Sequence, residues 1–151
     1  MNTSIETIVN GVKELEQNLG VISTSTLDGK PESAVVYFTY DESMNIYFTT
    51  RKDSRKYGNI TQNPAVAFVI YSPQLFKTLQ LEGVVSVVED AHAQGEHYSQ
   101  LVEFASTGKA LPPIDQLGES EIMFLKIETT WVRAGNFEAS RTGDVFQEVT
   151  K

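Results

Sequence analysis

The clearest chemical signal in the sequence is the segment Thr49-Thr50-Arg51-Lys52-Asp53-Ser54-Arg55-Lys56. Residues 51–56 carry four of the chain's 12 basic residues and one acidic residue, a net charge of +3, whereas the rest of the chain carries −11. Hydroxyl, guanidinium and ammonium groups beside a helix N-terminus are the donors that a phosphate monoester needs. The segment therefore predicts a small anion site, although its composition also fits a solvated strand-to-helix turn.

The overall composition limits the class of protein in which such an anion site can occur. The chain has 151 residues, 40% of them hydrophobic, a net charge of −8 and no cysteine. One folded domain is expected, without disulfides, thiolate metal sites or cysteine nucleophiles. The negative charge argues against nucleic acid and anionic membranes as partners. With no signal peptide and no apolar run of the ~20 residues that span a membrane, we expect a cytoplasmic location.

Most of the elements that must position this basic segment have the sequence pattern of a β-strand. Runs rich in β-branched and aromatic residues, separated by turn residues such as Asp28-Gly29, predict an antiparallel meander. The glycine in one run, Gly83, indicates a bulge or a close backbone approach. A weaker strand pair is expected in the tail, around Gly143-Asp144. The expected strands are 21–27, 34–40, 46–50, 65–71, 77–88 and 121–132.

Helical patterns are fewer and lie between the strands. Apolar residues spaced three and four apart predict a helix over 3–19, with Thr3 and Glu6 as a capping box and Gly20 as its stop. A short helix is expected over 53–62, begun by Asp53 or Ser54, a longer one over 90–107, and a helical turn over 114–117. His92 and His97 are five residues apart, on different helix faces, so we expect surface or capping histidines. The pattern as a whole favours a six- to seven-stranded antiparallel barrel with peripheral helices.

The order of several segments resembles the pyridoxamine 5′-phosphate oxidase-like family from near Gly29 to Glu89. That family has the FMN-binding split-barrel fold, so the resemblance implies one split-barrel domain over 1–151. The matching segments are Ile46-Tyr47-Phe48-Thr49-Thr50, Ser54-Arg55-Lys56, Asn63-Pro64 with the apolar run 65–69, and Leu79-Gln80-Leu81-Glu82-Gly83.

The resemblance implies a phosphate site in the basic segment. In the family, hydroxyls at the end of a strand and the following Arg-Lys pair hold the FMN phosphate. Those places are taken here by Thr49, Thr50, Arg55 and Lys56, with Ser54 adjacent.

It also implies contacts to the rest of the flavin and a second subunit. The backbone of Val35, Val36 and Tyr37 would run along the flavin ring, and Thr78 stands where the oxidases have a glutamine that contacts the ring or ribityl chain. The family is typically homodimeric with the flavin at the interface. Trp131, the single tryptophan, is a candidate to stack near the ring across the dimer, although core or interface packing is the more common role of such a residue.

The sequence departs from the oxidases in ways that leave the reaction open. Their C-terminal signature of tryptophan, arginine and histidine is missing, no histidine follows His97, and Ala34 and Thr39 stand at basic positions beside the flavin. We therefore expect an FMN-dependent oxidoreductase with an unassigned small-molecule substrate or nicotinamide donor. The open alternatives are a flavin-binding module without turnover, a split barrel using F420 or haem, and a barrel with no cofactor.

Overall fold

The computed structural model describes most residues of the chain. These are residues 4–16, 18–75, 77–89, 95–101, 103, 121–138, 143 and 145–151.

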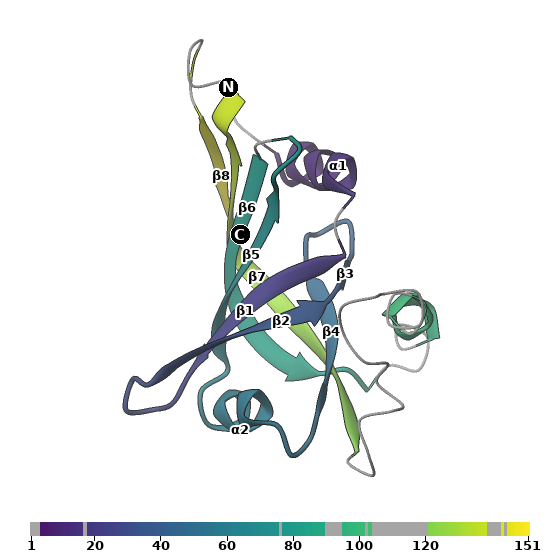
Figure 1. Cartoon of the computed structure of the whole chain (residues 1–151), viewed down its shortest axis with the longest axis vertical. Coiled ribbons are helices and arrows are strands. Elements are labelled where there is room, and N and C mark those ends of the chain that lie inside the picture. The colour runs from purple at the N-terminus through teal and green to yellow at the C-terminus, as the bar shows by residue number, and fades with distance from the viewer. Residues whose placement is uncertain are drawn as a thin grey trace.

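One antiparallel sheet makes up the body of the protein (Figure 1). Its strand order is β2-β1-β5-β6-β7-β4-β3, and β8 pairs with β7 beside this path. The mainly β, antiparallel class predicted from the sequence is confirmed. The strands are β1 (Leu19–Ser25), β2 (Pro31–Tyr37), β3 (Thr39–Tyr40), β4 (Ile46–Arg51), β5 (Ala65–Ser72), β6 (Lys77–Val87), β7 (Ile122–Asn136) and β8 (Phe146–Thr150).

The sheet is curled because its two ends are joined by a single residue. β2 and β3 stand at opposite ends of the strand order, yet only Phe38 separates them in the chain. The run predicted as one strand over 34–40 is therefore two strands, and the described sheet has eight. Such a connection is possible only when the two edges approach each other, which gives a barrel with a split between β2 and β4.

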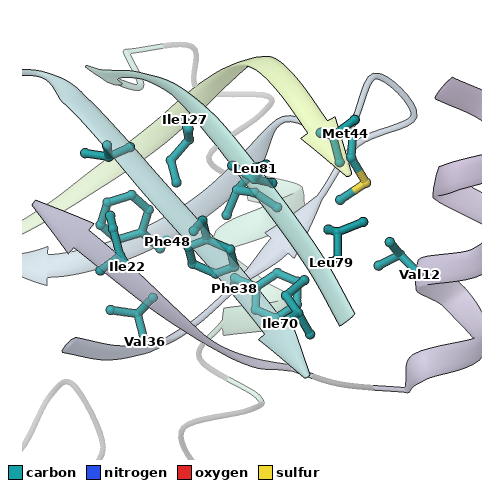
Figure 2. Close-up of a cluster of buried hydrophobic side chains, with 14 of the residues drawn as sticks. Val12, Ile22, Val36, Phe38, Met44, Phe48, Ile70, Leu79, Leu81 and Ile127 are labelled. Carbon is teal, nitrogen blue, oxygen red and sulfur yellow. The ribbon is translucent and has the colours of Figure 1, made fainter. Parts of the chain in front are cut away.

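The interior of the barrel is filled by the inward-facing residues of the strands. Phe38 is 1% exposed, and its ring lies 5.3 Å from that of Phe68 in an edge-to-face arrangement. Figure 2 shows both halves of the sheet contributing to this core, together with Val12 from the first helix. Every second side chain of a strand therefore points into the barrel, as the alternation of apolar and polar residues in the sequence predicts.

The first helix, α1 (Ile5–Leu15), covers one end of the barrel (Figure 1). Ser4 caps it, accepting a hydrogen bond from the Thr7 backbone N–H, and Glu16 ends it in the left-handed conformation. The predicted stop at Gly20 is wrong, because Gly20 lies in β1, where a side chain would collide with the ring of Phe68. The predicted cap Thr3 lies outside the described residues, which begin at Ser4.

Two other helical segments flank the barrel. α2 (Arg55–Gln62) lies at the end opposite α1, between the β1–β2 hairpin and the end of β4 (Figure 1). Residues 95–101 are helical, within the helix predicted over 90–107, whereas the turn predicted over 114–117 lies outside the described residues. No helix among the described residues is long and apolar enough to cross a membrane.

β7 runs to Asn136, beyond the predicted strand end, and the predicted tail pairing is confirmed by its antiparallel pairing with β8. The prediction at Gly83 is also confirmed. The β6–β7 register shifts between Glu82 and Gly83, and an added Cβ at Gly83 would collide with the carbonyl oxygen of Glu128. The bulge therefore requires a residue without a side chain.

Replacing Gly83 by alanine should lower the free energy of unfolding by about 1–3 kcal/mol, because backbone rather than a flexible side chain must move. Gly11→Ala is the matched control, since a Cβ there meets nothing within 4 Å and alanine favours a helix interior by about 1 kcal/mol. Urea denaturation measures both. Equal stability of Gly83→Ala and the unchanged protein would contradict the close approach.

Candidate functional site

Three polar side chains of the basic segment meet where β4 ends and α2 begins. The Thr50 and Ser54 hydroxyl oxygens are 2.9 Å apart, and the Lys56 ammonium donates a hydrogen bond of 3.0 Å to Thr50 Oγ1. Ser54 is also the cap of α2, accepting from the Tyr57 backbone N–H. We call Thr50, Ser54 and Lys56 the anion cluster, because two hydroxyls and an ammonium group converge at a helix N-terminus.

Lys56 is the charged member of the anion cluster, and its charge is poorly compensated. Burial lowers the pKa of its ammonium group, and the nearby charge of Glu32 only partly opposes that effect. None of the four ion pairs within the described residues includes Lys56. A half-buried cation that contacts hydroxyls rather than a carboxylate is stabilised when an anion binds next to it.

Two of the predicted phosphate ligands do not join the anion cluster. Thr49 is adjacent to Thr50 on a strand, so its side chain points to the opposite face of the sheet. Arg55 is exposed and turns to Glu32, with its Nε 3.3 Å from the carboxylate Oε2. The structure therefore brings together three of the five residues predicted for the phosphate.

Glu32 and Asn59 are site residues that the sequence reasoning missed. The Asn59 side-chain amide donates to Glu32 Oε2 at 3.2 Å and to Thr24 Oγ1 at 3.1 Å. Asn59 and Thr24 are buried, so these bonds tie α2 to both β1 and β2. The sequence does contain one signal for Glu32. Side chains alternate between the two faces of a strand, so Glu32 shares the inner face of β2 with Ala34 and Val36.

The other basic residues of the segment are paired at the surface. Arg51 binds Asp53 through two hydrogen bonds of 2.9 and 2.6 Å, and Lys52 lies 3.3 Å from Glu121. These pairs account for two of the four positive charges that made the segment stand out.

The predicted ring-contacting strand lies directly beside the anion cluster. Val35, Val36 and Tyr37 belong to β2, which has β1 as its single strand partner in the described sheet. The opposite backbone edge of β2 borders the split, next to the point where Glu32 contacts α2. Val35 is 51% exposed, whereas Val36 and Tyr37 are buried.

Thr78 and Trp131 lie far from the anion cluster within one chain. Thr50 pairs with Met123 on β7, and Trp131 is eight residues further along that strand, roughly 26 Å at ~3.3 Å per residue. Thr78 pairs with Gly135, further still in the same direction. Within one chain, Thr78 and Trp131 are therefore well separated along β6 and β7 from the anion cluster.

Of the two histidines predicted to be surface or capping residues, His92 lies outside the described residues and His97 is partly exposed but held by two specific contacts. Its ring stacks on Tyr47 with centroids 3.9 Å apart, and its Nδ1 lies 2.8 Å from Thr39 Oγ1. Burial lowers its pKa, while the carboxylates of Glu96 and Asp41 act in the opposite direction. His97 thus fastens the 95–101 helix to β3 and β4. No group of acidic residues and histidines within the described ranges could hold a metal ion.

Comparison with known proteins gives one family over most of the chain. Residues 6–134 match the family model described as pyridoxamine 5′-phosphate oxidase. A pyridoxine/pyridoxamine 5′-phosphate oxidase from Sphingopyxis alaskensis is 28% identical over 118 residues, which are 75% of this chain and 54% of that enzyme. The chain spans about half the length of the curated relatives it matches.

Solved structures of similar fold bind different cofactors. An FMN-binding, pyridoxamine 5′-phosphate oxidase-related protein from Nostoc punctiforme has a TM-score of 0.63 and 16% identity, covering 93% of this chain and 85% of its own. A haem-binding protein from Mycobacterium smegmatis has a TM-score of 0.71 and 16% identity, with coverages of 99% and 59%. An F420 reductase has a TM-score of 0.60 and 26% identity, with coverages of 78% and 91%. The first two likenesses show the split-barrel fold alone.

The lowered pKa of His97 predicts a pH-dependent stability. An unfolded histidine titrates near 6.5, above the pKa in the folded protein, so the unfolded chain binds the extra proton first. The contribution of His97 is present above pH 6.5 and is lost as the pH falls below it. Urea denaturation at pH 7.5 and 5.5 should show a smaller decrease for His97→Asn than for the unchanged protein. Parallel decreases would contradict the burial of a neutral imidazole.

Proposed function

The chain belongs to the pyridoxamine 5′-phosphate oxidase family, whose split barrels commonly bind FMN, and from this we propose that it is an FMN-binding oxidoreductase. The observation that carries the proposal is the anion cluster, in which the partly buried Lys56 donates to the Thr50 hydroxyl and Thr50 in turn contacts the Ser54 hydroxyl.

The chemistry of these residues fits the phosphate end of FMN. Lys56 would supply the positive charge, and the Thr50 and Ser54 hydroxyls can rotate to donate to phosphate oxygens. The N-terminus of α2 adds a favourable dipole. Arg55, now held by Glu32, lies on the same turn of α2 and would reach the phosphate from its exposed position.

β2 is suitably placed for the flavin ring. From Glu32, which contacts α2, to Val35 is three residues, or roughly 10 Å of strand. The backbone groups of Val35, Val36 and Tyr37 on the split side would hydrogen-bond the ring edge and orient it. The exposed side chain of Val35 would limit access for an electron donor or acceptor. FMN itself supplies hydride or electron transfer, so no acid or base is required from this chain.

We do not propose pyridoxamine phosphate as the substrate that this chain oxidises. By the family resemblance, Ala34 and Thr39 stand where the oxidases have basic residues beside the flavin. The substrate is therefore left as a small molecule or a nicotinamide donor.

We propose a homodimer in which the second copy completes the flavin site. Thr78 and Trp131 are well separated along the sheet from their own chain's anion cluster, but a partner's sheet face could supply them. That outer face also bears exposed apolar side chains, including Val35, Tyr71 and Phe146. Burial of such side chains in a subunit interface is favourable.

Sedimentation equilibrium should give the mass of two chains. Tyr71→Arg should shift the equilibrium to monomers and weaken FMN binding by about tenfold or more, because an uncompensated charge would enter the interface. Leu27→Arg, at the exposed tip of the β1–β2 hairpin, is the matched control and should change neither property. A monomer that binds FMN with unchanged affinity would overturn the dimeric site.

Visible absorption and fluorescence titration with FMN test the cofactor assignment. The unchanged protein should take up FMN, and Arg55→Ala combined with Lys56→Ala should weaken binding by at least about a hundredfold, because two charge-assisted contacts of ~1.5–3 kcal/mol each are lost. The paired variant Arg51→Ala with Lys52→Ala removes the same charge from the same segment and should retain binding. Equal loss in both would mean that general charge, not the anion cluster, holds FMN.

Adding NADPH under argon then separates the candidate functions. Bleaching of the bound flavin supports a nicotinamide-dependent reductase, whereas bound flavin that stays oxidised favours a binding module or another donor.

F420 is the second candidate cofactor, since the F420 reductase is 26% identical over 78% of this chain. Uptake of F420 without uptake of FMN would replace the first proposal with the second.

A further inference from the structure

We propose that Glu32 is a specificity-determining residue of the anion cluster, which lowers the affinity of the cluster for a doubly charged phosphate monoester such as FMN more than its affinity for a singly charged phosphodiester. This inference rests on the proposed function, in that it concerns the phosphate group held by Lys56. It adds the residue that makes the affinity of the site depend on the charge of the ligand.

The carboxylate of Glu32 is fixed at the wall of the site. Its Oε2 accepts from Asn59 Nδ2 at 3.2 Å and lies 3.3 Å from Arg55 Nε. The Glu32 side chain is only 21% exposed, whereas that of Arg55 is 70% exposed. Because Asn59 is buried and also bonded to Thr24, the carboxylate is held in place from the barrel side and has little freedom to withdraw.

Glu32 reduces the positive charge that an anion would encounter. Arg55 and Lys56 together carry +2, and the Glu32 carboxylate brings the local sum to +1. The other cations of the segment are already paired, Arg51 with Asp53 and Lys52 with Glu121. A phosphate monoester carries about −1.5 to −2 at pH 7, so it exceeds this local charge, whereas a diester carries −1 and matches it.

The field of Glu32 reaches the atom that would hold the phosphate. Its negative charge acts on the Lys56 ammonium strongly enough to counter part of the effect of burial on that group's pKa. The same field repels an anion placed next to Lys56. Screening by salt is reduced, because Glu32 and Lys56 are both partly buried.

Glutamine at position 32 would remove the charge and keep the contacts. Its side-chain oxygen can accept from Asn59 and Arg55 as the carboxylate does, and its size is the same. Arg55 would no longer be neutralised and would be available to the ligand. The expected result of Glu32→Gln is therefore a gain in affinity for FMN, with the fold intact.

The matched control is Glu121→Gln. Glu121 also pairs with a lysine of the basic segment, Lys52 Nζ, at 3.3 Å, but its side chain and that of Lys52 are both more than half exposed. This variant changes the net charge of the protein by the same amount without altering the anion cluster. It isolates the local effect of Glu32 from that of total charge.

Three flavins that share one ring system serve as probes in fluorescence titrations of the unchanged protein, Glu32→Gln and Glu121→Gln. They are riboflavin, its cyclic 4′,5′-phosphodiester with one negative charge, and FMN. In Glu32→Gln the dissociation constant of FMN should fall by about tenfold, that of the phosphodiester by less, and that of riboflavin should not change. Glu121→Gln should match the unchanged protein for all three.

Equal changes for the three probes, or an unchanged dissociation constant for FMN in a folded Glu32→Gln protein, would overturn the inference. If no variant binds any flavin, the proposed function falls, and inorganic phosphate then tests Glu32 alone. Phosphate should raise the melting temperature of Glu32→Gln more than that of the unchanged protein. An equal rise in both proteins would count against Glu32 whatever the cofactor.

Discussion

The connection through Phe38 is the constraint on which the rest of the structure depends. Because one residue separates the two ends of the sheet order, the sheet must curl until β2 and β4 face each other. Phe38 secures this geometry by placing its ring in the core against Phe68. The anion cluster on β4 and α2 is therefore placed beside the free edge of β2, although the two are distant in the sheet order.

The electrostatics of the site follow from this approach. Lys56 on α2 is partly removed from water, and the charge of Glu32 on β2 acts on it. In a chain with a net charge of −8, a cation that donates to a hydroxyl and belongs to no ion pair among the described residues is distinctive. The buried amide of Asn59 holds both sides together, so the charges of the site are positioned by the same contacts that close the barrel.

The sequence was sufficient to predict the elements with strong local signals. Strand alternation, the α2 start at Ser54 and the bulge at Gly83 depend on nearby residues, and all three are present in the structure. The end of the first helix was misplaced because Gly20 serves tertiary packing against Phe68 rather than a helix stop. Strand alternation places Glu32 on the inner face of β2, but its contact with Asn59, like that of His97 with Thr39, depends on a partner that only the fold brings close.

The 15-residue strand β7 also bears on how the chain folds. It pairs with β4 through its first half, with β8 through its second, and with β6 along nearly its whole length. During synthesis, β4 and β6 are made long before β7, so each has an unsatisfied edge until the last third of the chain emerges. Such edges are templates for pairing between molecules. Completion of the barrel is therefore a late, long-range event, and the nascent chain is most prone to aggregate just before β7 is inserted.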